Sequence, residues 1–304
     1  MNLHHDKEAF AELIIGAANE LAIPPNVIEK DYYVTITLKA LAEKTKDMVF
    51  KGGTSLTKCY QLLDRFSEDI DLSYTAESGM PGESRKKQLK NNIVSTMEEF
   101  GFPINNLETT RSGRNYNCYR ASYPSFYEQN GILKPELVIE TYVAMLPFPT
   151  TKRMVDNYIY RFLSEINRLD LAETYELMPF EITTQTIERT LVDKVFALCD
   201  YYMQEKTERH SRHLYDIHKI VETMGISNEL PNLIPEVRAV SSEMIVCPSA
   251  KEGVCVADIL REIINSQVYK RDYEDITMGL LFVQVDYETV IQSLQKVLDS
   301  GMWE

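Results

Sequence analysis

Residues 51–73 read KGGTSLTKCYQLLDRFSEDIDLS, and this stretch decides how the chain is expected to fold. It opens with Gly52 and Gly53, and glycine adopts backbone conformations that let the main chain approach a ligand closely. The next residues, 55–63, carry apolar side chains at the spacing of a short helix. A helix N-terminus offers free N–H groups and the positive end of the helix dipole, so this turn suits a phosphate group.

The same stretch ends in a Ser-x-Asp-x-Asp pattern. Asp69 and Asp71 flank Ile70, and such alternation is typical of a strand. Residues two apart on a strand point to the same side, so both carboxylates face one way, an arrangement that suits hard divalent cations. An Asp-x-Asp alone is common in solvated loops, whereas turn, helix and carboxylate strand in this order are far more specific. The stretch is not a Walker A loop, which needs Gly-Lys-[Ser/Thr] where this chain has Thr57-Lys58-Cys59.

The chain is acidic: its 304 residues include 32 basic and 46 acidic ones, for a net charge of −14. A protein with this balance is not a general nucleic-acid coat, so RNA would have to bind at a local basic patch. Each such patch can equally be a solvated face of a helix or loop. The candidates are Arg85, Lys86, Lys87 and Lys90; Arg111, Arg114 and Arg120 with nearby tyrosines; and Lys206, Arg209 and Arg212.

Cysteines and histidines predict a reducing compartment and argue against a zinc site. The five scattered cysteines suit free thiols. His210, His213 and His218 match no standard zinc-ligand spacing. The sequence shows neither a basic-then-apolar leader nor an apolar run of membrane-spanning length, and we therefore expect a cytoplasmic protein.

The glycine turn, the short helix and the Asp-x-Asp strand together resemble the nucleotidyltransferase superfamily. The sequences of residues 50–56 (FKGGTSL) and 65–72 (RFSEDIDL) are similar to the corresponding motifs of the AbiEii/AbiGii toxin family. Its members are the nucleotidyltransferase components of bacterial type IV toxin–antitoxin and abortive-infection systems. The resemblance implies an α+β fold, with a polymerase beta-like mixed sheet and helices followed by a mainly helical C-terminal domain.

Three later segments carry the resemblance further. Glu140 lies in an apolar strand, residues 135–143, and resembles the third carboxylate of the superfamily; a plain ion pair would also explain it. Lys194 lies beside the core face of a helix and matches a catalytic lysine of the family, although it could instead snorkel or pair with a carboxylate. Asp216, in an Arg-bearing Leu-Tyr-Asp-Ile helix, could orient Lys194, contact the nucleotide or position the acceptor.

The resemblance implies a complete set of site residues. The expected metal ligands are Asp69, Asp71 and Glu140, which would hold two Mg²⁺ ions. The expected nucleotide-binding residues are Gly52, Gly53, Thr54, Ser55 and Lys194, and the expected catalytic residues are Asp69, Asp71, Ser67, Lys194 and Asp216.

The chain is expected to form three parts. Residues 1–46 would be helices that pack on a nucleotidyltransferase domain at 47–150, and residues 151–304 would form a helical domain. Within 104–127 we expect two strands, followed by a strand at 136–143 that closes the sheet. Helices are expected at 153–168, 184–204 and 210–225, and a loop at 227–235. The active site would lie in a cleft between the catalytic and helical domains.

The expected function is Mg²⁺-dependent transfer of a nucleotide from an NTP to an acceptor hydroxyl, with RNA such as tRNA as acceptor. The family also implies a separately encoded antitoxin, often a winged-helix protein. Two alternatives stay open at this point. The acceptor could be a small molecule or a protein, or the chain could be a non-catalytic module that binds nucleotide.

Overall fold

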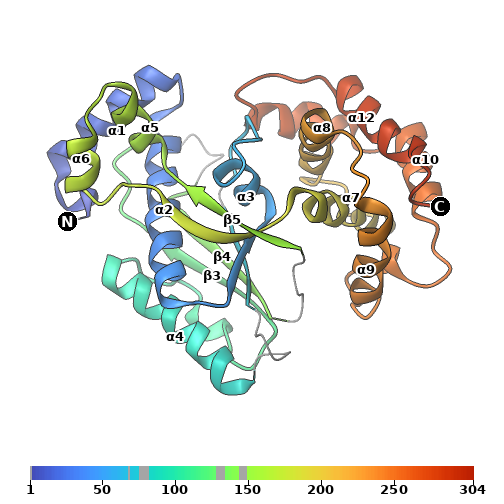
Figure 1. The fold of residues 1–304 in the computed structure, drawn as a ribbon, viewed down its shortest axis with the longest axis horizontal. Helices are drawn as coiled ribbons and strands as arrows, with labels where there is room; N and C mark the ends of the chain where they lie inside the picture. The colour runs from blue at the N-terminus through green and yellow to red at the C-terminus, as the bar shows by residue number, and fades with distance from the viewer. Residues whose placement is uncertain (1, 68, 75–81, 128–133, 144–148) are drawn as a thin grey trace. The chain divides into compact units, whose positions relative to one another are not determined.

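The computed structural model describes residues 2–67, 69–74, 82–127, 134–143 and 149–304. The chain divides into two compact units. Unit 1 comprises residues 1–60 and 67–184, and unit 2 comprises residues 61–66 and 185–304. The strands of the sheet belong to unit 1, and helices α7 to α12 belong to unit 2 (Figure 1).

Unit 1 contains a six-stranded mixed sheet with the strand order β3-β4-β2-β1-β6-β5. Its strands are β1 (Met48–Lys51), β2 (Asp69–Tyr74), β3 (Tyr116–Ser122), β4 (Glu136–Tyr142), β5 (Thr150–Val155) and β6 (Phe180–Gln185). Strand β2 runs parallel to β4 and antiparallel to β1, while β3 runs antiparallel to β4. The mixed sheet with helices confirms the fold class expected from the sequence.

At strand β4 one face of the sheet packs on the core, and the other is only partly covered. Leu137, Ile139 and Thr141 of β4 are buried, and the residues between them are half-buried. This period of two is what a strand produces when one of its faces packs on a core. The buried side chains join a cluster that runs through the N-terminal helices and α5.

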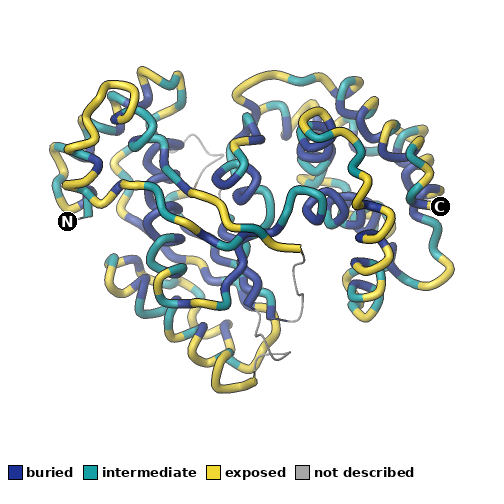
Figure 2. The backbone as a smooth tube through the Cα atoms, viewed as in Figure 1, coloured by how far each residue is buried: buried dark blue, intermediate teal, exposed yellow. Residues whose placement is uncertain are grey.

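The helices of unit 1 follow from ordinary sequence signals. They are α1 (Lys7–Leu21), α2 (Pro25–Lys44), α3 (Gly52–Lys58), α4 (Glu83–Phe100), α5 (Tyr158–Glu165) and α6 (Leu169–Thr174). Asp6 caps α1 by accepting from Ala9 N, and Pro25 opens α2 at a position where proline costs no hydrogen bond. Helix α2 is buried along most of its length, as Figure 2 shows, and contacts α1, α4 and α5.

Unit 2 is built from helices. They are α7 (Ile187–Met203), α8 (Arg212–Met224), α9 (Leu230–Ser241), α10 (Val256–Ser266), α11 (Lys270–Asp272) and α12 (Tyr287–Asp299). Helix α7 contacts α8, α9 and α10, and α12 contacts α8 and α10. Within the described residues, no helix combines the length and the apolar character that crossing a membrane would require.

Several local expectations are wrong. The helix after the glycine turn begins at Gly52 and ends at Lys58 instead of covering 55–63, and Gln61 beyond it has a left-handed backbone with φ of 52°. Among the described residues of 104–127, β3 is the one strand; Ile104 forms only an isolated bridge with Ala121. Strand β4 lies inside the sheet rather than at its edge. The expected loop at 227–235 overlaps α9, which contains Pro235.

The division into units differs from the expected boundaries at residues 46 and 150. The segment 151–184 belongs to unit 1 because it contains most of β5 and β6, which extend the sheet beyond β1. The expected helix at 153–168 is therefore split: β5 ends at Val155, and α5 starts only after Asn157, whose side chain caps it by accepting from Tyr160 N. Residues 61–66, in contrast, belong to unit 2.

Candidate active site

The glycine turn is built around the carboxylate of Asp71. Gly52 has a φ of +78°, which L side chains rarely adopt, and a Cβ at this position would lie 2.1 Å from Asp71 Oδ2. Glycine is therefore required here for two independent reasons. The turn and the Asp-x-Asp strand fit against each other, as their order in the sequence suggested.

Three hydroxyl groups stabilise this turn. Ser55 is fully buried, and its Oγ donates to the carbonyl of Gly52 at 2.8 Å. The Oγ1 of Thr54 lies 2.9 Å from the Oγ of Ser67, at hydrogen-bond distance. Ser67 therefore ties the segment that enters β2 to helix α3. This bond gives Ser67 a structural role beside the catalytic role that the resemblance implies.

A row of polar residues crosses four neighbouring strands. In the sheet register, Lys51 of β1 lies opposite Asp71 of β2. Asp71 in turn lies beside Glu140 of β4, and Glu140 lies opposite Cys118 of β3. Directly paired residues present their side chains on the same face of a sheet. All four are half-buried, so the row lies on the partly covered face.

Two tyrosines hold the carboxylate of Glu140. Tyr142 donates its hydroxyl to Oε2 at 2.6 Å, and Tyr116 donates to Oε1 at 3.1 Å. Burial and then the negative charge of Glu140 raise the pKa of both phenols, so both keep their protons at neutral pH and act as donors. The ammonium group of Lys51 lies 4.1 Å from the centre of the Tyr142 ring. The ring of Tyr142 thus lies between a cation and a carboxylate.

The donor set suits a divalent cation, although the side chains do not converge on one point. Asp69, Asp71 and Glu140 offer carboxylate oxygens, which hard cations prefer. Each oxygen of Glu140 accepts one hydrogen bond from a tyrosine and has a second lone pair for a metal. Across the described ranges, however, no three His, Cys, Asp or Glu side chains form a group close enough to bind a metal ion. The metal assignment thus remains a prediction.

Lys194 and Asp216 lie in a buried charge cluster of unit 2 that also contains Arg65. Arg65 Nε donates to Asp216 Oδ1 at 2.6 Å, and Nη2 donates to Oδ2 at 2.7 Å. Lys194 Nζ lies 2.6 Å from the same Oδ2. Two cations therefore share one carboxylate.

The pKa shifts in this cluster follow from that sharing. Burial alone would raise the pKa of Asp216, but Arg65 and Lys194 outweigh burial and hold it well below its usual value. Burial lowers the pKa of Lys194, and the positive charge of Arg65 lowers it further, while Asp216 opposes both effects. Asp216 is therefore an anion at neutral pH, because a carboxylate between two cations is strongly favoured in its ionised form.

A second buried lysine–aspartate pair lies in unit 1. Lys58, the last residue of α3, pairs with Asp31 of α2 and donates to Thr35 Oγ1 at 2.7 Å and to the Asp156 carbonyl at 3.1 Å. The other oxygen of Asp31 accepts from Tyr158 N at 2.9 Å. This pair therefore fixes α3, and with it the glycine turn, to α2 and α5.

The structure gathers the predicted residues in two sets. Gly52, Gly53, Thr54, Ser55, Ser67, Asp69, Asp71 and Glu140 belong to unit 1, and Lys194 and Asp216 belong to unit 2. Sequence reasoning assigned no role to Arg65, Tyr116 or Tyr142. Tyr142 stands two residues after Glu140, so the period of a strand could have placed both side chains on one face. Nothing local in the sequence indicates the partner of Arg65.

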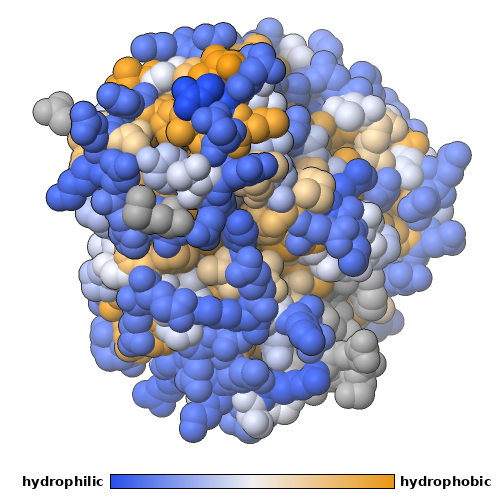
Figure 3. Space-filling model, turned by 60° about the vertical axis from the view of Figure 1, so that its left-hand side comes forward, coloured by the Kyte–Doolittle hydropathy of each residue, from blue (hydrophilic) through white to orange (hydrophobic). Residues whose placement is uncertain are grey.

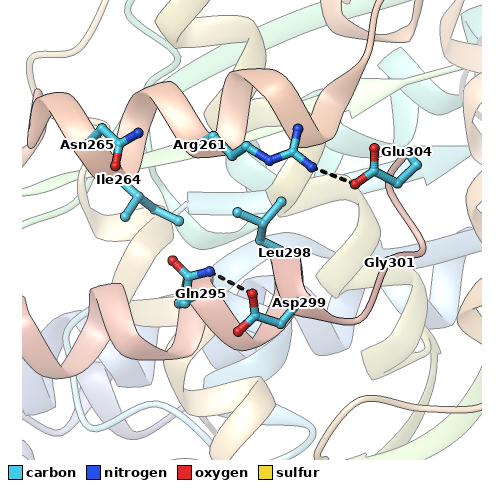
Figure 4. Close-up of a pocket in the computed structure, with 8 residues that line it drawn as sticks. All are labelled: Arg261, Ile264, Asn265, Gln295, Leu298, Asp299, Gly301 and Glu304. Carbon is cyan, nitrogen blue, oxygen red and sulfur yellow. Dashed lines mark hydrogen bonds and ion pairs between the residues drawn. The ribbon is translucent and has the colours of Figure 1, made fainter.

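A separate hollow in unit 2 lies between α10, α12 and the C-terminal residues (Figure 4). Its lining residues are Arg261, Ile264, Asn265, Gln295, Leu298, Asp299, Gly301 and Glu304. The polar groups in it pair with one another: Arg261 Nη2 donates to Glu304 at 2.6 Å, and Gln295 donates to Asp299 at 2.7 Å. None of the predicted site residues, all of which the structure describes, lines this hollow.

Comparison with known proteins relates the chain to one family. A family model described as "Nucleotidyl transferase AbiEii toxin, Type IV TA system" matches residues 37–299. Among solved structures, MenT4, a nucleotidyltransferase toxin from Mycobacterium tuberculosis H37Rv, matches with a TM-score of 0.56 and 16% sequence identity, over 95% of this chain and 89% of that chain. At this identity the structural match speaks for the fold alone. No curated protein matches the sequence.

Proposed function

The chain belongs to the AbiEii family of nucleotidyl transferase toxins of type IV toxin–antitoxin systems, and we propose that it transfers a nucleotide from an NTP to a hydroxyl group of RNA, such as a tRNA, with Mg²⁺. Family membership makes the chain a nucleotidyltransferase, as the sequence predicted. The acceptor, the metal and the roles of individual residues are proposals. They rest on the geometry of the partly covered sheet face in unit 1.

The position of Asp71 is the observation that carries the proposal. Its carboxylate lies against the glycine turn, where a Cβ on Gly52 would come within 2.1 Å of Oδ2. Its register places it beside Glu140 on the neighbouring strand. Asp71 therefore joins the feature expected to bind a triphosphate to the row of carboxylates expected to bind metal.

We assign the metal to Asp69, Asp71 and Glu140, with two Mg²⁺ ions. Bound ions would lower the pKa of the acceptor hydroxyl and neutralise charge on the triphosphate and the departing pyrophosphate. The hydrogen bonds from Tyr116 and Tyr142 would fix the orientation of the Glu140 carboxylate. A preorganised ligand loses less conformational entropy on binding.

We assign the triphosphate to the turn at Gly52, Gly53, Thr54 and Ser55. The first N–H groups of a helix have no partner within the helix and are available to phosphate oxygens. Ser55 would contribute its N–H rather than its hydroxyl, which donates to Gly52. In unit 2, Lys194 would neutralise charge on the pyrophosphate, with its ammonium group held by Asp216.

The family pairs each toxin with an antitoxin. For this chain we propose a separately encoded winged-helix antitoxin that restrains growth arrest, together with a cytoplasmic location and a role in abortive infection. A small gene of that type next to the gene for this chain would support the pairing.

The test is the incorporation of label from each of the four radiolabelled NTPs into the RNA, protein and small-molecule fractions of a cell extract. Asp69→Asn and Asp71→Asn should each abolish Mg²⁺-dependent labelling of RNA while the protein stays folded. Asp47→Asn is the matched control, because Asp47 makes an exposed ion pair with Arg85 in the same unit. Full activity in both Asp69→Asn and Asp71→Asn would contradict the metal assignment, and labelling confined to another fraction would contradict the RNA acceptor.

A further inference from the structure

Two basic segments that are separate in the sequence form one surface in unit 1. Lys86 and Lys90 of α4 reach the loop before β3: Lys86 Nζ donates to Asn115 Oδ1 at 2.7 Å, and Lys90 Nζ donates to the Thr110 carbonyl at 2.8 Å. The contacts place the lysines of α4 beside the arginines of the loop. We use the name basic surface for Lys86, Lys87, Lys90, Arg111 and Arg114.

The loop of the basic surface has a fixed shape. The buried side chain of Asn117 accepts from Arg111 N at 2.9 Å and donates to the Arg111 carbonyl at 3.0 Å. Arg114 N donates to the Arg111 carbonyl at 3.1 Å, which closes a turn. The arginines therefore project from a backbone that needs little further ordering when a ligand binds, which lowers the entropic cost of binding.

The positive charges of the basic surface are not neutralised by ion pairs. Within the part of the chain that the structure describes, none of its five cations pairs with a carboxylate; Lys86, Lys90 and Arg114 donate hydrogen bonds to neutral oxygens. Neighbouring cations differ, since Arg85 pairs with Asp47 and Arg120 pairs with Glu136. Such a cluster is unusual for a chain with a net charge of −14.

The acidic side chain of Glu83 reaches the basic surface. Glu83 lies beside Gly113, where a Cβ on the glycine would be 3.4 Å from Glu83 Oε2. Within the residues that the structure describes, the five cations of the basic surface outnumber this carboxylate. The lower part of Figure 3, where α4 lies in unit 1, is largely hydrophilic, which suits a charged partner more than an apolar one.

The basic surface leads directly to the proposed site. Its loop ends at Asn115, and the next residue, Tyr116, begins β3. Tyr116 is 44% exposed, and its hydroxyl donates to Glu140. A polyanion on the basic surface would therefore pass an exposed aromatic ring immediately beside the carboxylate row, and an aromatic ring is a platform on which nucleic-acid bases stack.

We infer that the basic surface binds the phosphate backbone of the RNA acceptor and that Tyr116 stacks on a base of the strand where it approaches Glu140. This inference rests on the proposed function, because it takes RNA as the acceptor. It adds the location of the contact. Binding is independent of sequence on the basic surface, since phosphates carry no base information.

The experiment measures binding of a short fluorescein-labelled single-stranded RNA by fluorescence anisotropy, in EDTA and without NTP, over a series of salt concentrations. In Lys87→Gln/Arg111→Gln the affinity should fall, and the slope of log K against log salt should shrink by about 1.4, at about 0.7 for each lost phosphate contact. Tyr116→Leu should weaken binding by about fivefold or more without changing this slope, because stacking is not a charge contact.

The matched control is Lys152→Gln/Arg168→Gln, which removes the same two residue types from exposed ion pairs in the same unit. It should change neither the affinity nor the salt slope. If Lys87→Gln/Arg111→Gln binds RNA like the wild type while the wild type labels RNA, the basic surface is excluded and the proposed function stands. If the wild type neither binds nor labels RNA, the acceptor in the proposed function is itself wrong.

Discussion

The two buried lysine–aspartate pairs look alike and differ in what surrounds them. The side chains of Lys58 and Asp31 are 4% and 7% exposed, and those of Lys194 and Asp216 are 8% and 0% exposed. Burying a charged pair costs several kcal/mol of desolvation unless further hydrogen bonds complete it, so each pair needs an explanation. The resemblance to the toxin family drew attention to only one of them.

The pair in unit 1 is complete. The three N–H groups of Lys58 donate to three acceptors, on Asp31, Thr35 and Asp156. The pair consists of one cation, Lys58, and one anion, Asp31. Burial lowers the pKa of Lys58, and the negative charge of Asp31 opposes that shift. Nothing in this arrangement calls for a ligand, and its consequence is the position of α3.

The pair in unit 2 shares its carboxylate with a second cation. Asp216 accepts from Arg65 with both oxygens and also lies 2.6 Å from Lys194. The comparison teaches that burial and an ion pair alone do not separate a structural lysine from a functional one. The two pairs differ in what the carboxylate keeps when the lysine is removed, because Asp216 retains Arg65, and this difference can be tested by substitution.

The largest effect on stability is expected for Lys58→Met. It leaves the buried Asp31 without its cation, and losing one partner of a buried pair costs about 3–5 kcal/mol of unfolding free energy. Denaturant unfolding measures it. The double variant Lys58→Met/Asp31→Leu should recover part of the loss, because no buried charge is then left unpaired. A Lys58→Met protein as stable as the exposed-pair control Lys152→Met would contradict the structural role.

A smaller effect is expected for Arg65→Lys. Lysine keeps the charge but cannot make the two-atom contact with Asp216, and a charge-assisted hydrogen bond contributes about 1.5–3 kcal/mol to stability. Arg168→Lys is the matched control, since Arg168 makes the same two-atom contact with Asp170 at the surface. It should leave the denaturation midpoint unchanged. Equal midpoints for Arg65→Lys and the wild type would show that the contact carries little of the stability of unit 2.

The sequence predicted features that lie within one short stretch, and it did not predict contacts between residues that are far apart in the chain. The order of turn, helix and strand could be predicted because Gly52, Gly53 and the spacing of Asp69 and Asp71 lie within one short stretch. Strand β4 could be predicted from the apolar, β-branched run at residues 135–143. The partner of Arg65 could not, because Asp216 lies 151 residues away and nothing in either segment indicates the other.

The same limit explains the errors in the fold. Strand β6 joins the sheet through a pairing of Thr184 with Phe50, which no window of sequence around either residue contains. The resemblance to a family identified Lys194 and Asp216 as candidates. A family pattern covers residues that lie far apart in the sequence, and a local pattern does not. The resemblance supplied no role for Arg65 and none for the tyrosines on Glu140.

Lys194→Met should separate stability from activity. It leaves Asp216 bound to Arg65, so we expect a change of about 1 kcal/mol in unfolding free energy, well below that of Lys58→Met. Transfer of label from NTP to RNA should nevertheless be lost, because the positive charge proposed to meet the pyrophosphate is gone. Full transfer activity with a large loss of stability would reverse the two assignments and make Lys194 the structural lysine.

The smallest effect is a dependence of that stability difference on pH. Arg65 and Lys194 hold the pKa of Asp216 below its unfolded value of about 3.9. Between the two pKa values the unfolded chain binds more protons, so the unfolding free energy falls as the pH falls. The attraction between Lys194 and Asp216 is complete above the unfolded pKa and disappears as Asp216 is protonated.

The unfolded value is common to both proteins, so the stability of the wild type relative to Lys194→Met should decline only where Asp216 of the variant, still bound to Arg65, takes up a proton. That range lies below about pH 4, and the slope is at most about 1.4 kcal/mol per pH unit, because one proton is involved. Denaturant unfolding of both proteins from about pH 7 to the lowest pH at which both stay folded measures the difference. The wild type and the surface variant Lys152→Met should keep a constant difference over the same range. A constant difference for Lys194→Met as well would mean that Lys194 does not favour the ionised form of Asp216.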